Sequence, residues 1–479
     1  MNPEDALLLL DTIIKPKHLN ATQELVFHHC WSGKTYLEIS QISGYDPDYI
    51  RVIGSKLWNL LSSELGEKVT KHNFRAVLRE QLRKPEFSDI FNIADKSANK
   101  LKIKDTDQQR PPVSGSSHAR VLQKQRPMSE AKVFPSGPLP LHSSLYIERP
   151  KVEEYAYDAI TQQGMLLRIK AAQKMGKTSL MLRLLDYASS QQMRTVRLNF
   201  CQADEAHIQS IDSLLQWFCA NISQQLKLDA DPSDCWNEVL GSKISATFFL
   251  RDYILEPLSA PIVIALDDVD WLFQYETVAR DFLLLLRLWH EESNNMGVWQ
   301  NLRLILVYCT EKLSLLNANH ALFNIGIPIE LGELDYDRCL KLTSHYQSFF
   351  PHDLSIADVT QRLYSLVKGH PHLLRLALYH LTQRRMALEE IVQNAPTQEG
   401  FYRTYLQKYL ITIQQNPALA EALSKIIQED NPVQVDVPIA YQLYSLGLIT
   451  FAGNHVRPRC ELYRQYFQSQ LNEVFLQKE

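Results

Sequence analysis

Hydrophobic and polar positions divide the chain into stretches of different character. Within residues 1–90, apolar side chains recur at helical spacing, as at Ile50, Ile53 and Leu57, which predicts a compact helical domain. Residues 91–142 are instead rich in Lys, Arg, Ser, Gln and Pro and contain few aromatic residues. Such a stretch cannot bury enough apolar surface to offset the entropy lost on ordering, so we expect a flexible linker there.

From residue 143 to residue 330 the pattern alternates between short apolar runs and helical stretches. Four runs fit buried strands: MLLRI (165–169), TVRLNF (195–200), PIVIAL (261–266) and LRLILVY (302–308). This alternation predicts an α/β core with a parallel sheet and flanking helices. Residues 331–400 are predicted to form a helical lid. Residues 401–479 are predicted to contain helices, a hairpin in which LIT and HVR flank FAGN, and a last helix.

The clearest chemical motif is AAQKMGKTSL, at 171–180, which lies between the first apolar run and a helical stretch. A strand, a tight loop and a helix in this order are typical of a P-loop, whose backbone N–H groups hold phosphate oxygens. Lys177 is expected to reach the β- and γ-phosphates, and the Thr178 hydroxyl to ligate Mg²⁺. The predicted nucleotide-binding residues of the loop are Ala171, Ala172, Gln173, Lys174, Met175, Gly176, Lys177, Thr178 and Ser179.

Two features qualify this motif. Ala171 stands where the first glycine of a P-loop is usual. A second GKT, at Gly33, Lys34 and Thr35, follows Trp31 and a helical segment, so we interpret it as a chance match.

An acidic pair follows the third apolar run. Asp267 and Asp268 close PIVIAL at the carboxyl end of a predicted strand, where ligand sites of open parallel sheets lie. Asp267 is expected to hold Mg²⁺, and Asp268 to position or polarise the attacking water. The alternative is that the pair only caps the next helix.

Three further positions are weaker candidates. Thr310 ends the fourth apolar run and either senses the γ-phosphate or caps the strand. Arg287 either reaches a phosphate or is solvated or ion-paired. Pro371 follows Gly369 in a corner that either contacts the nucleotide or is an ordinary helical corner. No NKxD segment occurs, so adenine rather than guanine nucleotide is expected.

The stretch from residue 145 to about residue 471 resembles the AAA-like ATPase domain common in cyanobacterial proteins. The resemblance is carried by LYIERPKVEEYAYDAI, LLRIKAAQKMGKTSLMLRLL, GHPHLLRLALYHL and RPRCELYRQYF, among others. LDDVD and GHP also resemble motifs of signal-transducing STAND-type NTPases. The resemblance implies a P-loop NTPase with a helical lid and a C-terminal winged helix. Glu311 stands where many relatives of that class carry Arg.

Residues 20–80 suggest three short helices with a turn at Gly44, and they resemble the N-terminal helix-turn-helix domain of vWA-MoxR-associated proteins. Residues 1–90 contain 11 Lys and Arg against 12 Asp and Glu. The predicted recognition helix offers Arg51 and Lys56 but also Asp46 and Asp48. DNA binding, docking of a protein and a purely structural role therefore all stay open.

Composition narrows the class of protein. The formal net charge of −4 and the pI of about 6.4 argue against a polycation built to coat nucleic acid. Seven scattered cysteines without a CxxC pair predict reduced thiols in a cytoplasmic protein. Neither a signal peptide nor an apolar run of membrane-spanning length is expected.

These observations favour a regulatory switch that binds ATP with Mg²⁺, hydrolyses it slowly and changes its partner or its self-association. The family resemblance adds a possible setting in signalling or defence. A DNA-binding transcriptional regulator with a structural nucleotide is the alternative, and a scaffold with a dead site is a third. Retention of Lys177, Thr178, Asp267 and Asp268 together argues against the third.

Overall fold

The computed structural model describes residues 10, 19, 21–43, 47–71, 73–81, 130–293, 295, 297–310, 325–351, 353–383 and 387–476. The chain divides into two compact units, Met1–Ser129 and Glu130–Glu479. Each unit is described by itself.

The first unit contains four described helices: α2 (Ala21–Trp31), α3 (Tyr36–Ser43), α4 (Pro47–Leu65) and α5 (Phe74–Gln81). Phe74 of α5 packs against both α2 and α4: its ring centroid lies 5.5 Å from that of Phe27 on α2 and 4.8 Å from that of Trp58 on α4. The Trp58 indole donates a hydrogen bond of 2.7 Å to the Tyr36 hydroxyl. A Cβ on Gly54 would lie 2.5 Å from that hydroxyl, so a larger residue at this position of α4 would displace the Tyr36 ring. The predicted turn at Gly44 lies outside the described residues.

The GKT at Gly33, Lys34 and Thr35 lies between α2 and α3, and Thr35 directly precedes α3. The Thr35 hydroxyl accepts the backbone N–H of Glu38 at 3.2 Å, and the Glu38 carboxylate accepts the backbone N–H of Thr35 at 2.7 Å. This reciprocal pair is a capping box. It gives Thr35 a local structural role, in line with the interpretation of this GKT as a chance match.

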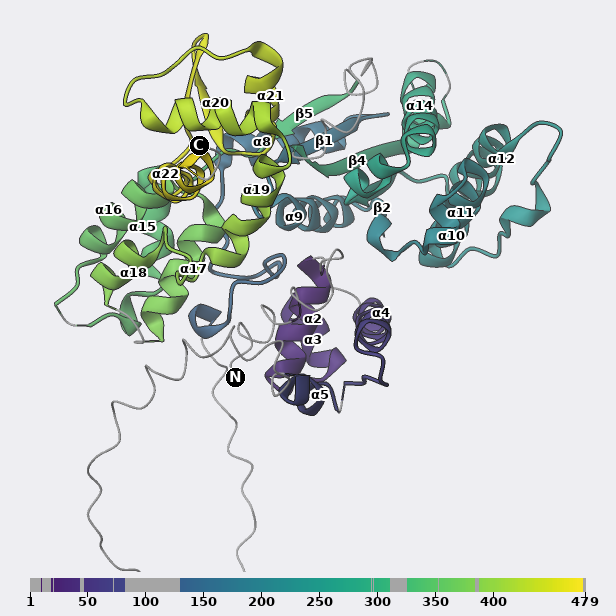
Figure 1. Ribbon diagram of the computed structural model, residues 1–479. Coiled ribbons are helices and arrows are strands. Elements are labelled where there is room, and N and C mark those ends of the chain that lie inside the picture. The colour runs from purple at the N-terminus through teal and green to yellow at the C-terminus, as the bar shows by residue number, and fades with distance from the viewer. Residues whose placement is uncertain are drawn as a thin grey trace, which may run out of the picture. The chain divides into compact units, whose positions relative to one another are not determined.

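The second unit is built on a five-stranded parallel sheet (Figure 1). Its strands are β1 (Leu166–Ala171), β2 (Arg194–Asn199), β3 (Ile262–Asp267), β4 (Leu302–Cys309) and β5 (Ile327–Glu330). The order across the sheet is β2-β3-β4-β1-β5, so β4 separates β1 from β3. All four predicted strands are present. Three of them begin and end within one residue of the expected bounds, and β1 continues two residues beyond its expected end at Ile169. The short β5, whose sequence IPIE includes a proline, was not predicted.

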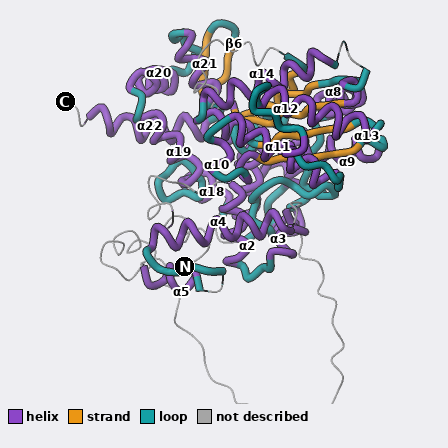
Figure 2. Tube along the Cα trace, turned by 90° about the vertical axis from the view of Figure 1, so that its right-hand side faces the viewer, coloured by secondary structure: helices purple, strands orange, loops and turns teal. Residues whose placement is uncertain are grey.

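Successive strand residues point to opposite faces of the sheet, and apolar side chains lie on both faces. Helices cover each of the two faces. On one face Ile169, Val263 and Val307 pack with α8 (Pro150–Thr161) and α9 (Lys177–Ser190). On the other face Leu198 and Leu266 pack with α11 (Ile211–Leu226) and α14 (Glu276–Glu292). In Figure 2 the strands run through the region where α8, α9 and α11 are labelled. Between β2 and β3 the chain also forms α10 (Glu205–Ile208), α12 (Ser242–Phe248), a π-helical turn (Phe249–Leu255) and α13 (Glu256–Leu258).

The remaining elements share one hydrophobic core. They are α15 (Tyr336–Ser344), α16 (Ile356–Val367), α17 (Pro371–Thr382), α18 (Leu388–Asn394), α19 (Arg403–Gln414), α20 (Pro417–Gln428), α21 (Val437–Ser445), β6 (Ile449–Ala452), β7 (His455–Pro458) and α22 (Glu461–Leu476). Leu363 and Leu373 belong to the same buried cluster as Leu406 and Tyr466. The segments expected to be a lid and a winged helix are therefore packed together.

The linker expected over 91–142 needs correcting at its C-terminal end. The second unit begins at Glu130. Ala131 is buried, and the Phe134 ring packs edge-on against Tyr379 of α17 at 5.3 Å. The backbone N–H of Leu139 donates to the Ser179 hydroxyl on α9 at 2.9 Å. Sparse but well-placed apolar residues thus attach this segment to the core, which a reading based on average composition overlooks.

Two expectations from composition can be compared with the described residues. None of the seven cysteines, which all lie in described ranges, forms a disulfide. In the same ranges, no helix combines the length and the hydropathy needed to cross a bilayer.

Candidate functional site

The loop that joins β1 to α9 has the conformation of a phosphate-binding turn. Lys174 and Gly176 both have positive φ, 59° and 98°, so the chain turns sharply before the helix begins at Lys177. The Gly176 carbonyl accepts the first helical hydrogen bond, from the backbone N–H of Leu180 at 3.0 Å. The loop therefore leads directly into a helix N-terminus, which favours negatively charged ligands.

Lys177 is buried, and its ammonium lies against the beginning of the loop. The Nζ atom donates to the carbonyl oxygens of Ala171 at 3.1 Å and Ala172 at 2.8 Å. The positive charge is therefore held next to the backbone that would surround a phosphate.

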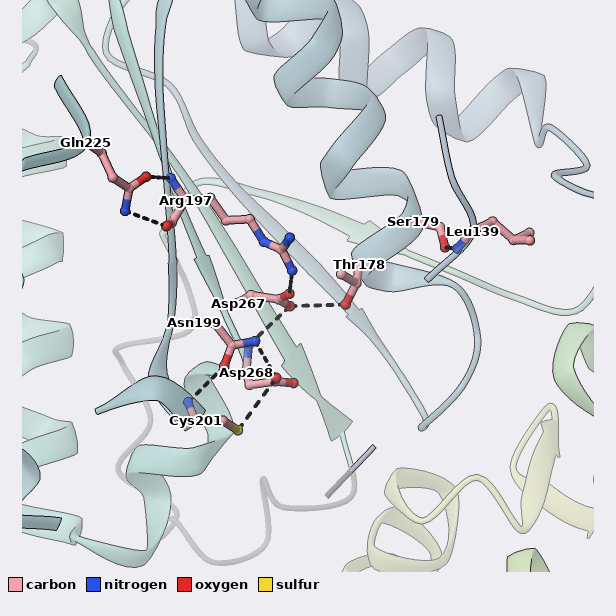
Figure 3. Close-up of polar contacts among 9 residues, drawn as sticks. All are labelled: Leu139, Thr178, Ser179, Arg197, Asn199, Cys201, Gln225, Asp267 and Asp268. Atoms are coloured by element: carbon pink, nitrogen blue, oxygen red, sulfur yellow. Dashed lines mark hydrogen bonds and ion pairs between the residues drawn. The ribbon is translucent and has the colours of Figure 1, made fainter. Parts of the chain in front are cut away.

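Thr178 and Asp267 meet at the carboxyl end of the sheet (Figure 3). The Thr178 hydroxyl donates to Asp267 Oδ1 at 3.2 Å. Asp267 ends β3 and is 1% exposed. Its carboxylate also forms an ion pair with Arg197 of β2, whose Nη2 lies 3.1 Å from Oδ2. The sequence-based reasoning did not identify Arg197, because nothing in TVRLNF distinguishes it from a solvated strand residue.

Asp268 begins the next turn in a left-handed conformation, with φ 53° and ψ 40°. Its Oδ2 accepts a hydrogen bond of 2.8 Å from the Asn199 amide, and the Cys201 thiol lies 3.7 Å away. Withdrawal from water, and then the negative charges of Asp267 and Asp270, raise the pKa of Asp268 to about 7. Asn199 was also missed by the sequence analysis. It lies opposite Asp267 in the register of β2 with β3.

The end of β4 lies between the loop and the acidic pair. Asp270, which is buried, accepts the backbone N–H of Cys309 at 2.9 Å and so fixes the end of β4 to the turn after β3. The Thr310 hydroxyl donates to the Ser445 carbonyl at the end of α21, at 2.8 Å. In this arrangement Thr310 joins the sheet to the C-terminal helices.

A buried arginine supports the loop from the segment before α8. Arg149 Nη2 donates to the Met175 carbonyl at 3.2 Å. The Glu153 carboxylate accepts the Arg149 backbone N–H at 2.8 Å and the Tyr146 hydroxyl at 2.9 Å, which fixes this segment. Burial lowers the pKa of Arg149. Arg149 was not singled out from the sequence, although it lies within LYIERPKVEEYAYDAI, one of the stretches that carry the family resemblance.

The tip of the loop touches the C-terminal elements. Lys408 on α19 donates to the Gln173 side-chain oxygen. The Lys174 ammonium lies 6.0 Å from the centre of the Tyr405 ring, also on α19. A Cβ on Gly447, in the turn after α21, would lie 2.8 Å from the Ala172 Cβ. Movement of the loop would therefore change its contacts with α19 and with the turn after α21.

The corner before α17 is tightly packed. A Cβ on Gly369 would lie 1.9 Å from the Leu334 carbonyl oxygen, and Pro371 occupies the first turn of α17. His370 Nδ1 accepts the backbone N–H of Leu373 at 3.4 Å, and its Nε2 lies 3.1 Å from the Tyr405 hydroxyl. Burial, with the charges of Arg459 and Lys408, lowers the pKa of His370 to about 3.

The predicted residues do not all converge. Thr178, Asp267 and Asp268 lie together, with Lys177 in the adjoining loop. The Ser179 hydroxyl instead accepts the Leu139 N–H, away from the acidic pair (Figure 3). Arg287 forms an ion pair of 2.7 Å with Glu291 on the same helix, as one of its two interpretations expected. Glu311 lies outside the described residues.

The chemistry of this site fits a nucleotide with a hard divalent cation. A helix N-terminus and the Lys177 ammonium supply positive charge for phosphates. The Thr178 hydroxyl and the Asp267 carboxylate supply the oxygen ligands that Mg²⁺ prefers.

Comparison with protein families adds an independent line of evidence. The family model described as AAA-like domain matches residues 134–469, well over half of the chain. The family model described as vWA-MoxR associated protein N-terminal HTH matches residues 1–81. No curated protein matches the chain.

Several solved structures are similar to the chain. The Walker-type ATPase paby2304 of Pyrococcus abyssi has 13% identity and a TM-score of 0.49, covering 67% of this chain and 96% of its own. The ORC2 protein of Aeropyrum pernix, in its ADPNP-ADP complexes, has 12% identity and a TM-score of 0.44, covering 69% and 94%. CDC6p from Pyrobaculum aerophilum has 12% identity and a TM-score of 0.35, covering 71% and 98%.

Proposed function

Because this chain belongs to the AAA-like domain family, we propose that it is an ATP-binding regulatory NTPase of the STAND-like kind. One observation carries the proposal: Thr178 Oγ1 and Asp267 Oδ1 lie 3.2 Å apart at the end of the sheet, beside the Lys177 loop. A phosphate-binding lysine, a hydroxyl and a carboxylate in this relation are what binding of a triphosphate with Mg²⁺ requires.

Each residue has a defined task in this proposal. The first turn of α9 receives the phosphates, and Lys177 leaves the carbonyls of Ala171 and Ala172 for the stronger acceptors of the β- and γ-phosphates. Thr178 and Asp267 hold the metal ion. Mg²⁺, when bound, neutralises phosphate charge and orients the triphosphate.

Asp268 is the proposed base. Its carboxylate directly follows Asp267 at the carboxyl end of β3, where a water beside the bound triphosphate would lie. The Asn199 amide bonds the same carboxylate at 2.8 Å and competes with a water for it. We therefore expect slow hydrolysis, which suits a switch that resets rarely.

The contacts of the loop tip are the proposed route to a conformational change. Gln173 and Lys174 touch Lys408 and Tyr405 of α19, so closing the loop on phosphates disturbs these contacts. Thr310 would act with them, either as a γ-phosphate sensor or through its bond to Ser445. The lid corner at Pro371 and the proposed winged helix at 401–479 would then move together, because they share one core.

The first unit is the proposed recognition module, which binds DNA or a protein. Its near balance of 11 basic and 12 acidic residues over 1–90 makes either partner reasonable. ATP-dependent self-association, a signalling or defence setting and a cytoplasmic location stay predictions.

Equilibrium binding to the full chain tests the proposal. ATP with MgCl₂ should bind saturably and more tightly than GTP, because the sequence lacks the NKxD segment that reads guanine. A folded protein that shows no saturable ATP binding would exclude the proposed function.

A second candidate function is favoured by the helix-turn-helix match at 1–81: a DNA-binding transcriptional regulator whose nucleotide is structural. Electrophoretic shift assays at increasing salt distinguish the two. Tight DNA binding that is indifferent to ATP, ADP and Lys177→Ala would favour this second candidate. DNA binding that changes with the bound nucleotide would favour the switch.

A further inference from the structure

Arg197 connects the edge strand of the sheet to the proposed metal site. Val196 and Leu198 pack on the face of α11 and α14, so Arg197 lies on the opposite face, which α9 covers. Its register partner on β3 is Ala265, and its side chain extends along the strands to Asp267. Figure 3 shows the guanidinium group reaching the Asp267 carboxylate from β2.

Asp267 needs a positive partner in this environment. It is 1% exposed, and a carboxylate removed from water is strongly destabilising unless it is paired and hydrogen-bonded. Its Oδ1 accepts bonds of 3.2 Å from the Thr178 hydroxyl and from the backbone N–H of Asp268. Its Oδ2 lies 3.1 Å from Arg197 Nη2, which brings a full positive charge.

We propose that Arg197 is an internal counter-ion that occupies Asp267 until Mg²⁺ arrives with the nucleotide and takes its place. The inference rests on the proposed function, since it requires that Asp267 hold a metal ion. A metal ion beside Thr178 and Oδ1 would repel the guanidinium at Oδ2 of the same carboxylate, so metal binding and the Arg197–Asp267 ion pair weaken one another. The planar guanidinium then becomes available to phosphate oxygens, which match its geometry.

This exchange sets the order of binding. The ion pair of Asp267 and Arg197 carries no net charge. It therefore attracts Mg²⁺ alone only weakly. It also spares an incoming nucleotide the repulsion of a bare carboxylate. Arg197 thereby favours entry of the metal with its nucleotide over entry of the metal alone. A phosphate-contacting arginine on β2 would also supply a charge that Glu311 does not offer.

A Mg²⁺ titration of ATP binding measures the competition. Relative to the native chain, Arg197→Gln should bind ATP at least about fivefold more weakly in EDTA, because Asp267 is left without its counter-ion and its bare carboxylate repels the phosphates. The MgCl₂ midpoint is the concentration at which the metal-dependent rise in ATP affinity is half complete. In the same variant this midpoint should be about tenfold lower, because Arg197 no longer occupies Asp267. Arg194→Gln is the matched control: Arg194 is exposed on the same strand and should change neither value.

These opposite shifts separate the proposal from a merely structural role, which would weaken both kinds of binding. An unchanged or higher MgCl₂ midpoint in folded Arg197→Gln overturns the proposal. If the native chain binds no ATP, the proposed function fails instead, and a ligand-free experiment still judges the ion pair.

That experiment is a double-mutant cycle on unfolding, without nucleotide or metal. Arg197→Gln alone should be destabilised more than Arg197→Gln combined with Asp267→Asn, since the double variant leaves no buried unpaired charge. If Arg197→Gln does not fold, the double variant should still fold. The MgCl₂ titration is then carried out with Arg197→Lys, whose midpoint should be no higher than that of the native chain. Failure of the double variant to fold would show that Arg197 acts through packing and would overturn the proposal.

Discussion

The Thr178 hydroxyl donates a hydrogen bond of 3.2 Å to a carboxylate oxygen of Asp267, although 89 residues separate them in the chain. The bond joins the first turn of α9 to the end of β3, past the intervening strand β4. It depends on the sheet order, because parallel strands bring their carboxyl ends to one edge. The function proposed for the second unit therefore depends on the topology as well as on the motifs.

Replacement of Lys177 by alanine should remove most ATP affinity while leaving the fold intact. The lysine is buried beside the loop, and no other loop residue replaces its reach to the β- and γ-phosphates in our proposal. Loss of a charge-assisted phosphate contact predicts at least about a tenfold rise in Kd. Isothermal titration measures this, with Lys151→Ala, an exposed lysine of α8, as control. Native-like binding by folded Lys177→Ala would remove this loop from the site.

Replacement of Asp268 by asparagine should preserve ATP binding and slow turnover by about tenfold or more, as expected when a group that accepts a proton from water is lost. Asparagine keeps the shape of the side chain but cannot accept that proton. Phosphate release under single-turnover conditions gives the rate. Asp186→Asn, at an exposed position of α9, is the control. A native rate in Asp268→Asn would assign the water to another group.

Replacement of Arg149 by methionine should weaken ATP binding and stability together. The substitution leaves the Met175 carbonyl without its 3.2 Å donor and so loosens the loop. We expect a destabilisation of about 1–2 kcal/mol, typical of a lost hydrogen bond to a buried group. Chemical denaturation and ATP titration measure the two effects. Arg338→Met is a matched control, since Arg338 donates to the nearby Glu148 carbonyl from a half-buried position. If the Arg149 variant differs from this control in neither assay, Arg149 does not support the loop.

The loop and the acidic pair of the candidate site could be predicted from the sequence, because the signals for a strand and for the loop that follows it are local. An apolar run followed by GKT, and another followed by Asp267 and Asp268, each imply a strand with a polar end. The structure brings Thr178 and Asp267 into contact, as these signals together suggested. The order of β4 between β1 and β3 was not predicted, because it is a property of the whole sheet.

The partners of these residues were harder to find. Arg197 and Asn199 look like ordinary strand residues. The register of β2 with β3 places Asn199 opposite Asp267, and Arg197, opposite Ala265, reaches Asp267 only through the length of its side chain. Arg149 reaches the loop from a segment that precedes the strand. The attachment of residues 130–142 depends on a few side chains, such as Phe134, within a polar stretch. Long-range contacts of this kind leave no periodic signal in the sequence.

Acidification should destabilise the second unit through His370. Burial lowers the folded-state pKa of His370 to about 3, below the ordinary value of 6.5, so the unfolded chain binds the proton more readily. Stability from this group is complete above about pH 6.5 and is lost as the pH falls toward 3, by at most about 1.4 kcal/mol per pH unit. Asparagine at position 370 can still cap α17 but does not titrate.

The unfolding free energy of His370→Asn should therefore fall less steeply between pH 6.5 and pH 4 than that of the native chain. Denaturant titrations at several pH values give both slopes, and His142→Asn, at an exposed position, should keep the native slope. Equal slopes in His370→Asn and the native chain would mean that His370 takes up its proton without unfolding.

Truncation should show that the nucleotide-binding unit begins at Glu130 and not at Leu145. A chain of residues 130–479 keeps the Phe134–Tyr379 contact and the hydrogen bond from Leu139 to Ser179, whereas a chain of residues 145–479 loses both. It also loses the bonds of Arg183 to the carbonyls of Pro140 and Leu141, at 2.8 and 3.1 Å. Together these losses predict a destabilisation of at least about 2 kcal/mol.

Thermal unfolding should thus give a lower Tm for the chain of residues 145–479, while the chain of residues 130–479 binds ATP as the full chain does. Limited proteolysis of the full chain should likewise leave a fragment that starts close to Glu130. Equal Tm values for the two chains would return residues 130–142 to the linker, and loss of ATP binding in the longer chain would show that the first unit contributes to the site.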